Sequence, residues 1–295
     1  MAQADHIFVC PHPLPALARR RPFRSGGIAM GAALSALSAG LGDALTPGQV
    51  LTTGASFMTW LTVQRIVTGP LLSLIFGHRR WSSRTDEQRH RCSISLTSCC
   101  FSICTMACGC IGLLFPSPGV VADPIYGHSG FVQFATANTV GFFLWNMLAE
   151  NSNAWGGFAN LIHHASCVIS FIMVQHPFSP RIACALMLFE ASTPALCTFN
   201  TLRNLGLEDS AVYRISRVLF AVLFFVFRLA LGIPLTLLWY MDMYALANDP
   251  QRQVHSTTIF NISLFLPIPF LGVQFYWFWL IARAACRKGP HAKAV

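Results

Sequence analysis

The chain has 295 residues, of which 54% are hydrophobic and 11% are charged, and its mean hydropathy is positive. This composition excludes an ordinary soluble domain and indicates a polytopic membrane protein. The formal net charge is +9. Because the basic residues gather beside the apolar segments, as topology signals do, they do not indicate nucleic-acid binding.

Residues 1–45 are set apart from the rest of the chain. The basic run Arg19-Arg20-Arg21-Pro-Phe-Arg24 precedes a weakly apolar stretch rich in Ala, Gly and Ser. Three interpretations are open: a signal or transit segment, an extra helix, and a disordered leader with translation starting at Met30. We place one membrane domain at residues 46–287 and a short basic tail at residues 288–295.

Seven segments of the domain are candidates for membrane-spanning helices, since a helix needs about 20 apolar residues to cross a bilayer. Their ranges are 50–76, 92–115, 130–149, 156–175, 181–200, 213–240 and 257–282. Backbone polar groups in lipid must be bonded within the chain. The sequence therefore predicts an all-α, polytopic membrane protein with about seven transmembrane helices enclosing a lipid cavity.

The second predicted span is rich in cysteine. Cys100, Cys104 and Cys108 are spaced by four residues and share one helical face. A metal site would require thiolates in lipid surroundings, without an obvious fourth ligand. Small side chains also allow helices to pack closely. We favour the packing role and predict no metal site.

Polar side chains recur at one depth in four neighbouring spans. The fourth span contains His163-His164 and the fifth contains Glu190. A rise of 1.5 Å per residue places His164 and Glu190 within about 3 Å of each other in depth, and Asn146 within about 5 Å of His163. Arg228 falls at mid-membrane too. Ionisable groups there cost several kcal/mol unless they face a polar interior, so they indicate a functional site.

The two histidines point about 100° apart on a helix. We therefore expect one to enter a central cavity and the other to contact a neighbouring helix. A His–Glu pair across helices suits general acid–base or nucleophilic chemistry, and it also suits a structural hydrogen bond. Both interpretations are open. Two adjacent histidines do not converge on one metal ion.

The basic residues also predict the topology. In a seven-helix arrangement, the loops after the first and fifth spans and the C-terminal tail share one side and carry twelve Arg and Lys residues. The positive-inside rule makes that side cytoplasmic. We expect an integral protein of the endoplasmic reticulum or plasma membrane with a cytoplasmic C-terminus. The short loops argue against a seven-helix receptor.

An ordered set of motifs resembles the TLC-domain family, the membrane domain shared by ceramide synthases and several lipid-associated proteins. The motifs, which run from about Trp81 to Arg287, are Trp81-x-x-Arg84 with His90, Asp123-Pro-Ile-Tyr-Gly127, Gly141-Phe-Phe-Leu-Trp145 with Asn146, Leu161-Ile-His163-His164, Glu190-Ala-Ser-Thr-Pro194, Phe224-Phe-Val-Phe-Arg228 and Gln274-Phe-Tyr-Trp277. Glu87 stands where the family has serine, and Asn146 stands where it often has aspartate. The acidic pattern that follows the histidines in ceramide synthases is missing.

The resemblance implies a role in membrane lipids. The Glu-x-Ser-Thr-Pro form is similar to the branch outside the ceramide synthases, whose members are linked to membrane lipid composition and fluidity. We expect a lipid-homeostasis protein that binds membrane lipids or fatty acyl chains and uses no cofactor. The alternative is a ceramide-synthase-like acyltransferase with fatty acyl-CoA as co-substrate.

The resemblance also supplies candidate roles for individual residues. In the acyltransferase alternative, His163 or His164 takes an acyl group or a proton, and Glu190 is the third catalytic candidate. The candidates for substrate contact are Trp81, Arg84, His90, Asn146, Arg228 and Gln274. The first three lie on the expected cytoplasmic face, where the anionic headgroup of coenzyme A would arrive.

Overall fold

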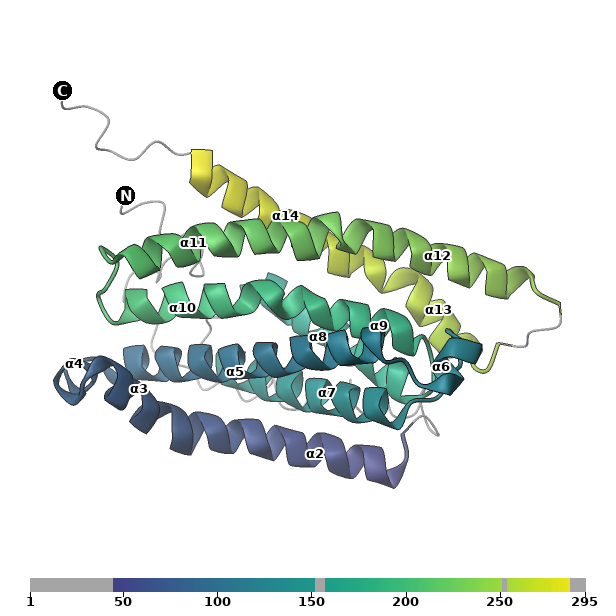
Figure 1. Ribbon diagram of the computed structural model, residues 1–295, viewed down its shortest axis with the longest axis horizontal. Helices are drawn as coiled ribbons and strands as arrows, with labels where there is room; N and C mark the ends of the chain where they lie inside the picture. The colour runs from purple at the N-terminus through teal and green to yellow at the C-terminus, as the bar shows by residue number, and fades with distance from the viewer. Residues whose placement is uncertain (1–44, 152–156, 251–253, 287–295) are drawn as a thin grey trace, which may run out of the picture.

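A computed structural model describes residues 45–151, 157–250 and 254–286. The regular structure of these residues is helical, with no strand among them. Long helices run back and forth along one axis (Figure 1), which confirms the predicted all-α class. Apart from Leu45, the predicted leader and the basic tail lie outside the described residues.

The elements follow one another with short connections. In chain order they are α2 (Pro47–Thr62), the π-helical turn η2 (Val63–Val67), α3 (Thr68–Phe76), α4 (His78–Ser82), α5 (Asp86–Leu114), α6 (Pro118–Ala122), α7 (Gly130–Asn151), α8 (Gly157–Gln175), α9 (Pro180–Met187), the 3₁₀ turn η3 (Leu188–Ser192), α10 (Thr193–Asn204), α11 (Ala211–Phe224), the π-helical turn η4 (Phe225–Ala230), α12 (Gly232–Asn248), α13 (Thr257–Phe265) and α14 (Pro267–Cys286).

Six helical stretches in the described part are long and apolar enough to cross a membrane. They are Pro47–Phe76, Asp86–Leu114, Gly157–Gln175, Pro180–Asn204, Ala211–Asn248 and Thr257–Cys286. Each coincides with one predicted span to within one residue or contains it. The other predicted span, residues 130–149, forms α7, which has 22 residues and lies alongside α5 (Figure 1). In the described part of the chain, six of the seven predicted spans are therefore long apolar helices, and the remaining one forms the long but less apolar helix α7.

Helix α7 tolerates its polar residues because neighbouring helices bond them. The Ser56 hydroxyl and the Trp60 indole N–H of α2 donate to Asn138 Oδ1 at 2.8 and 3.2 Å. On the other side, the Gln133 side chain donates to the backbone carbonyl of Gln175 at 3.3 Å. Bonds of this kind let a helix of lower apolarity stand inside a membrane bundle.

Small residues set the distance between two pairs of helices. A Cβ added to Gly141 of α7 would lie 2.6 Å from the Thr53 carbonyl oxygen of α2, and one added to Gly109 of α5 would lie 2.6 Å from the Cys184 carbonyl oxygen of α9. Of the predicted cysteine face, Cys100 and Cys108 pack against the main hydrophobic core. The described residues contain no group of three or more His, Cys, Asp or Glu side chains placed to hold a metal ion.

The two ends of the bundle differ in charge. The turn with α4, the turn between α10 and α11 and the end of α14 lie at one end, on the left in Figure 1, which we call the basic end. Its described arginines are Arg79, Arg80, Arg84, Arg89, Arg91, Arg203, Arg214, Arg217 and Arg283. The connections after α5, α8 and α12 lie at the opposite end. This division of the arginines is the one expected from the sequence.

Candidate functional site

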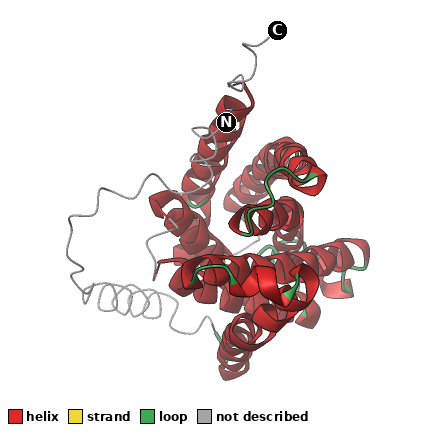
Figure 2. Ribbon diagram, turned by 90° about the vertical axis from the view of Figure 1, so that its left-hand side faces the viewer, coloured by secondary structure: helices red, strands yellow, loops and turns green. Residues whose placement is uncertain are grey.

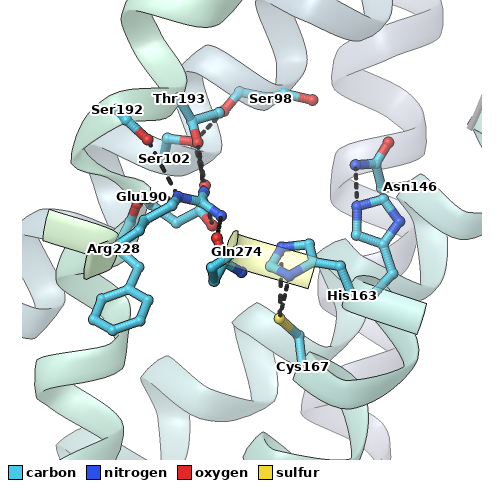
Figure 3. Close-up of polar contacts among 12 residues, drawn as sticks. Ser98, Ser102, Asn146, His163, Cys167, Glu190, Ser192, Thr193, Arg228 and Gln274 are labelled. Carbon is cyan, nitrogen blue, oxygen red and sulfur yellow. Dashed lines mark hydrogen bonds and ion pairs between the residues drawn. The ribbon is translucent and has the colours of Figure 1, made fainter. Parts of the chain in front are cut away.

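A buried ion pair joins two irregular turns near the middle of the bundle. The Nη2 atom of Arg228 in η4 lies 3.5 Å from the Oε1 atom of Glu190 in η3, and their side chains are only 7% and 12% exposed. Arg228 Nη1 donates to Gln274 Oε1 at 3.3 Å, which connects α14 to the pair. Figure 3 shows Arg228 at the centre of this group.

The local backbone explains how Arg228 is held. Pro194 has no N–H to give to the Glu190 carbonyl, which instead accepts from Thr193 N–H in the 3₁₀ pattern of η3. Thr193 N–H would bond the Phe189 carbonyl in a regular α-helix. That carbonyl accepts from Arg228 Nε at 3.1 Å. The proline thus frees a backbone acceptor for the guanidinium.

Hydroxyl groups complete the bonding of both charges. Arg228 Nε also contacts Ser192 Oγ at 3.2 Å, and Glu190 Oε2 accepts from Ser102 Oγ at 3.1 Å and from Thr193 Oγ1 at 2.7 Å (Figure 3). A buried ion pair is tolerated only when such extra bonds satisfy its remaining atoms. The pair is therefore a neutral, well-bonded unit.

His163 lies on the wall of a small pocket beside this unit. The pocket has a volume of about 20 Å³, and its lining includes Thr105, Phe143, His163, Cys167, Glu190 and Phe270. The imidazole lies among aromatic rings: Phe270 stacks on it at 5.6 Å, and Trp277 meets it edge-on at 5.1 Å. Its polar neighbour is Cys167, with Sγ 3.8 Å from Nε2 and 3.9 Å from Nδ1.

His164 points to a different helix. Its Nε2 atom lies 3.5 Å from Asn146 Nδ2 of α7, and Phe143 lies 5.6 Å from its ring. One histidine therefore enters the pocket and the other contacts a neighbouring helix, which confirms the prediction from their spacing. Asn146 was expected within about 5 Å of His163 in depth, and it contacts the adjacent residue His164.

The predicted His–Glu hydrogen bond does not form among the described residues. Glu190 shares the pocket wall with His163, but its oxygens bond Arg228, Ser102 and Thr193. The acid instead pairs with another predicted residue, Arg228. The depths estimated from the rise per residue put Glu190 and Arg228 in the same layer of the membrane. Which side chains pair within that layer depends on how far each irregular turn rotates them.

The pocket is too small for an acyl chain in this structure, since about 20 Å³ is close to the space of one water molecule. Two buried polar atoms have no hydrogen-bond partner among the described residues: Thr105 Oγ1, on the pocket wall, and Gln274 Nε2, on the side chain that bonds Arg228. Unbonded polar atoms in a buried region cost about 1–3 kcal/mol each. They are therefore candidate contacts for a polar group that enters the bundle.

Three predicted contact residues lie at the basic end and not at the centre. Trp81 packs partly buried beside Leu205, and the Arg84 guanidinium lies next to Gly206. His90 Nδ1 lies 3.3 Å from Gln64 Nε2, and Gln64 Oε1 accepts from Trp145 Nε1 at 3.4 Å. These residues line the face where a headgroup was expected.

Several partners of the central residues were not predicted from the sequence. Thr193 and Cys167 were detectable, because they stand three residues after Glu190 and four after His163, the spacings at which side chains meet on a helix. Ser102 gave no such signal, since it lies on a helix with many other Ser and Cys residues. Phe270 was hidden among the many aromatic residues of a membrane span.

Comparison with known families gives a match over most of the chain. A family model for the TLC domain matches residues 58–283, which is more than three quarters of the chain. The match contains His163, Glu190, Arg228 and Gln274, and also the basic-end residues. A search of curated proteins found no match.

Proposed function

The chain belongs to the TLC-domain family, and from that premise we propose that it binds the polar end of a lipid at its buried centre and so influences membrane lipid composition. The TLC domain and the membrane helices fit a membrane protein of lipid metabolism or homeostasis. Our proposal adds to this role a binding site, the buried centre, and a mode of binding, through the polar end of the lipid. It also assigns the chain to the branch outside the ceramide synthases.

The observation that carries this proposal is that the Glu190 carboxylate already pairs with Arg228 and accepts hydrogen bonds from Ser102 and Thr193, so it is not bonded to any of the described histidines. A general base of the His type is most effective when a carboxylate orients its ring and raises its basicity. His163 has a thiol as its polar neighbour, and His164 has an amide. This arrangement favours binding over proton transfer.

The polar group of the lipid is uncharged in this proposal. The ion pair already balances its own charges, so a further buried charge would have no partner. A hydroxyl or amide carbonyl would instead bond the unpaired Thr105 Oγ1 and Gln274 Nε2. The aromatic rings of Phe143, Phe171 and Phe270 on the pocket wall would contact the adjoining carbon chain.

Entry of a lipid requires helices to move apart, and α14 is the element we expect to move. It leans away from the bundle toward its C-terminal end (Figures 1 and 2). Its contacts with the centre are the Gln274–Arg228 hydrogen bond and the rings of Phe270 and Trp277 against His163. Displacement of α14 would therefore widen the pocket beside His163 without breaking the ion pair.

Native mass spectrometry of the purified full-length protein tests the binding proposal. His163→Leu and Gln274→Met remove polar atoms from the centre at nearly unchanged volume, and His78→Leu is the matched control at the exposed basic end. We expect co-purified lipid to decrease in the first two variants and to stay at the wild-type level in the control. Equal lipid content in all four proteins would contradict the proposal.

A second candidate function is acyl transfer from fatty acyl-CoA. The observation that favours it is the contact between His163 and Cys167, which places an imidazole and a thiol on one pocket wall. The test is transfer to long-chain amines and lysolipids by the wild type and by the His163→Ala/His164→Ala variant. Turnover that the variant lacks would establish this candidate, with His163 or His164 as the acceptor of an acyl group or proton.

The orientation follows from the charge division. We propose that the basic end and the C-terminus face the cytoplasm, in the endoplasmic reticulum or the plasma membrane. Trp81, Arg84 and His90 would then meet anionic headgroups from the cytoplasmic side, including coenzyme A in the acyltransferase alternative.

A further inference from the structure

A second pocket lies at the end of the bundle opposite the basic end. Its volume is about 120 Å³, and it is bounded by the last turn of α5, by α6 and by the first turns of α7 and α9. Most of its wall is apolar, with Ile111, Phe115, Val120, Phe131 and Val132 as the larger side chains. Its polar lining consists of Ser117, Ser129 and Arg181.

Arg181 is the residue that distinguishes this pocket. Its side chain is exposed, and it is the single Lys or Arg of the opposite end within the described ranges. It forms no hydrogen bond or ion pair with any described residue. A cation in the first turn of a helix is also unfavourable to the helix dipole. Neither its own helix nor another described residue therefore accounts for this charge.

The surroundings of the pocket place it at a membrane surface. Leu114, Phe115 and Val121 stand beside it with 72%, 75% and 65% of their surface exposed, as expected for side chains that face lipid. The helices end there, so the pocket lies at the depth of the lipid headgroups. The first turns of α7 and α9 add positive potential at the same place.

The size of the pocket limits what enters it. A volume of about 120 Å³ is what about four water molecules occupy in liquid water. A whole acyl chain therefore does not fit. The part of a lipid next to its headgroup does fit: its first apolar carbons would lie against Ile111 and Val132, and its anionic group would lie at the rim beside Arg181.

We propose that this pocket is a binding site for an anionic phospholipid, whose phosphate pairs with Arg181 and whose adjoining apolar segment fills the space between α5, α7 and α9. The site is separate from the pocket beside His163, which takes an uncharged group in the function proposed above. It would bind anionic phospholipids in preference to zwitterionic ones in the leaflet at the end of the bundle opposite the basic end.

The test is the retention of phosphatidylglycerol against phosphatidylcholine by the full-length protein in mixed nanodiscs, measured by native mass spectrometry. Arg181→Gln removes the charge, and Ile111→Trp fills the pocket from a half-exposed position. Arg214→Gln is the matched control, an exposed arginine in the first turn of α11 at the basic end. Inorganic phosphate alone is a further arm, because it carries the same anionic group without a lipid.

We expect a preference for phosphatidylglycerol that falls about fivefold in Arg181→Gln, the factor that corresponds to one exposed ion pair of about 1 kcal/mol. Ile111→Trp should lower it too, while Arg214→Gln and His163→Leu should keep the wild-type preference. An equal fall in both arginine variants would indicate general attraction and overturn the proposal. So would an unchanged preference in Arg181→Gln, or displacement of the lipid by inorganic phosphate alone.

Discussion

At the scale of single residues, Arg228 is the side chain that connects the buried polar groups at the centre of the protein. Its guanidinium reaches the Phe189 carbonyl, Ser192, Glu190 and Gln274, and these groups come from two other spans, so that Arg228 connects three spans in all. An arginine has five N–H donors in a fixed plane, which suits one side chain that bonds several partners. The two histidines have other neighbours: His163 contacts Cys167 of its own helix and the rings of α14, and His164 contacts Asn146 of α7.

The ion pair gives a prediction for stability. Arg228→Gln leaves the buried Glu190 carboxylate without its cation, so we expect the free energy of unfolding to fall by about 3–5 kcal/mol. The double variant Glu190→Gln/Arg228→Gln leaves no unpaired charge and should lose less than the two single variants combined. Denaturant unfolding of all four proteins in one detergent measures the coupling, and additive losses would contradict it.

His176, just beyond the end of α8, gives a prediction for pH. Burial, followed by the positive charge of nearby His255, lowers the pKa of His176 from its ordinary value of 6.5. The unfolded chain therefore takes up a proton at a pH where the folded chain stays neutral, so stability falls as the pH drops below about 6.5. His176→Gln should lose less melting temperature than the wild type between about pH 7.5 and 5.5.

The control for this pH effect is His128→Gln, since His128 is an exposed histidine at the same end of the bundle. This variant should keep the pH dependence of the wild type. If His176→Gln and the wild type lost the same melting temperature on acidification, His176 would not be the source of the effect.

At the scale of the elements, close contact between α2 and α7 depends on glycine. A Cβ at position 141 would overlap the α2 backbone, whereas one at position 54 of α2 has no atom within 4 Å. We expect Gly141→Ala to destabilise the protein by about 1–3 kcal/mol and Gly54→Ala to stabilise it by up to about 1 kcal/mol. Thermal unfolding distinguishes the two signs, and a stabilising Gly141→Ala would contradict the packing described.

The irregular turns also mark the limit of what the sequence predicts at this scale. The rise per residue placed Asn146 within about 5 Å of His163 in depth and Arg228 at mid-membrane, and in the structure Asn146 contacts the adjacent His164 and Arg228 contacts Glu190. It could not assign Glu190 to Arg228, because the 3₁₀ turn η3 and the π turn η4 rotate both side chains away from regular helical directions. Pro194 was visible in the sequence, but the partner of the carbonyl that it frees was not.

At the scale of the whole molecule, length and hydropathy were sufficient for the bundle. Among the described residues, six of the predicted spans match long apolar helices, and the other one forms the less apolar helix α7. The size of the predicted lipid cavity could not be predicted from the sequence. In the structure, side chains such as Phe143 and Phe270 fill the interior and leave a pocket of about 20 Å³ beside His163. A hydropathy pattern indicates which segments form helices, but it does not show how tightly their side chains pack against one another.

The charge division predicts how the molecule is oriented. Cys286 is exposed at the last turn of α14, at the basic end. A membrane-impermeant maleimide should therefore label it from the cytoplasmic side. The signal is the labelling that wild type shows and Cys286→Ser lacks, in sealed vesicles of known orientation. Labelling from the other side alone would reverse the topology.

The claim that a lipid binds at the buried centre is tested most directly by photo-crosslinking with a lipid that carries a photoactivatable group near its polar end. The crosslinked residues of the full-length protein are then mapped by mass spectrometry. We expect labels on the pocket wall, at Phe143, Phe171 and Phe270, that are lost in His163→Leu. Labels confined to outward-facing residues such as Leu74 and Leu237, unchanged in that variant, would contradict it.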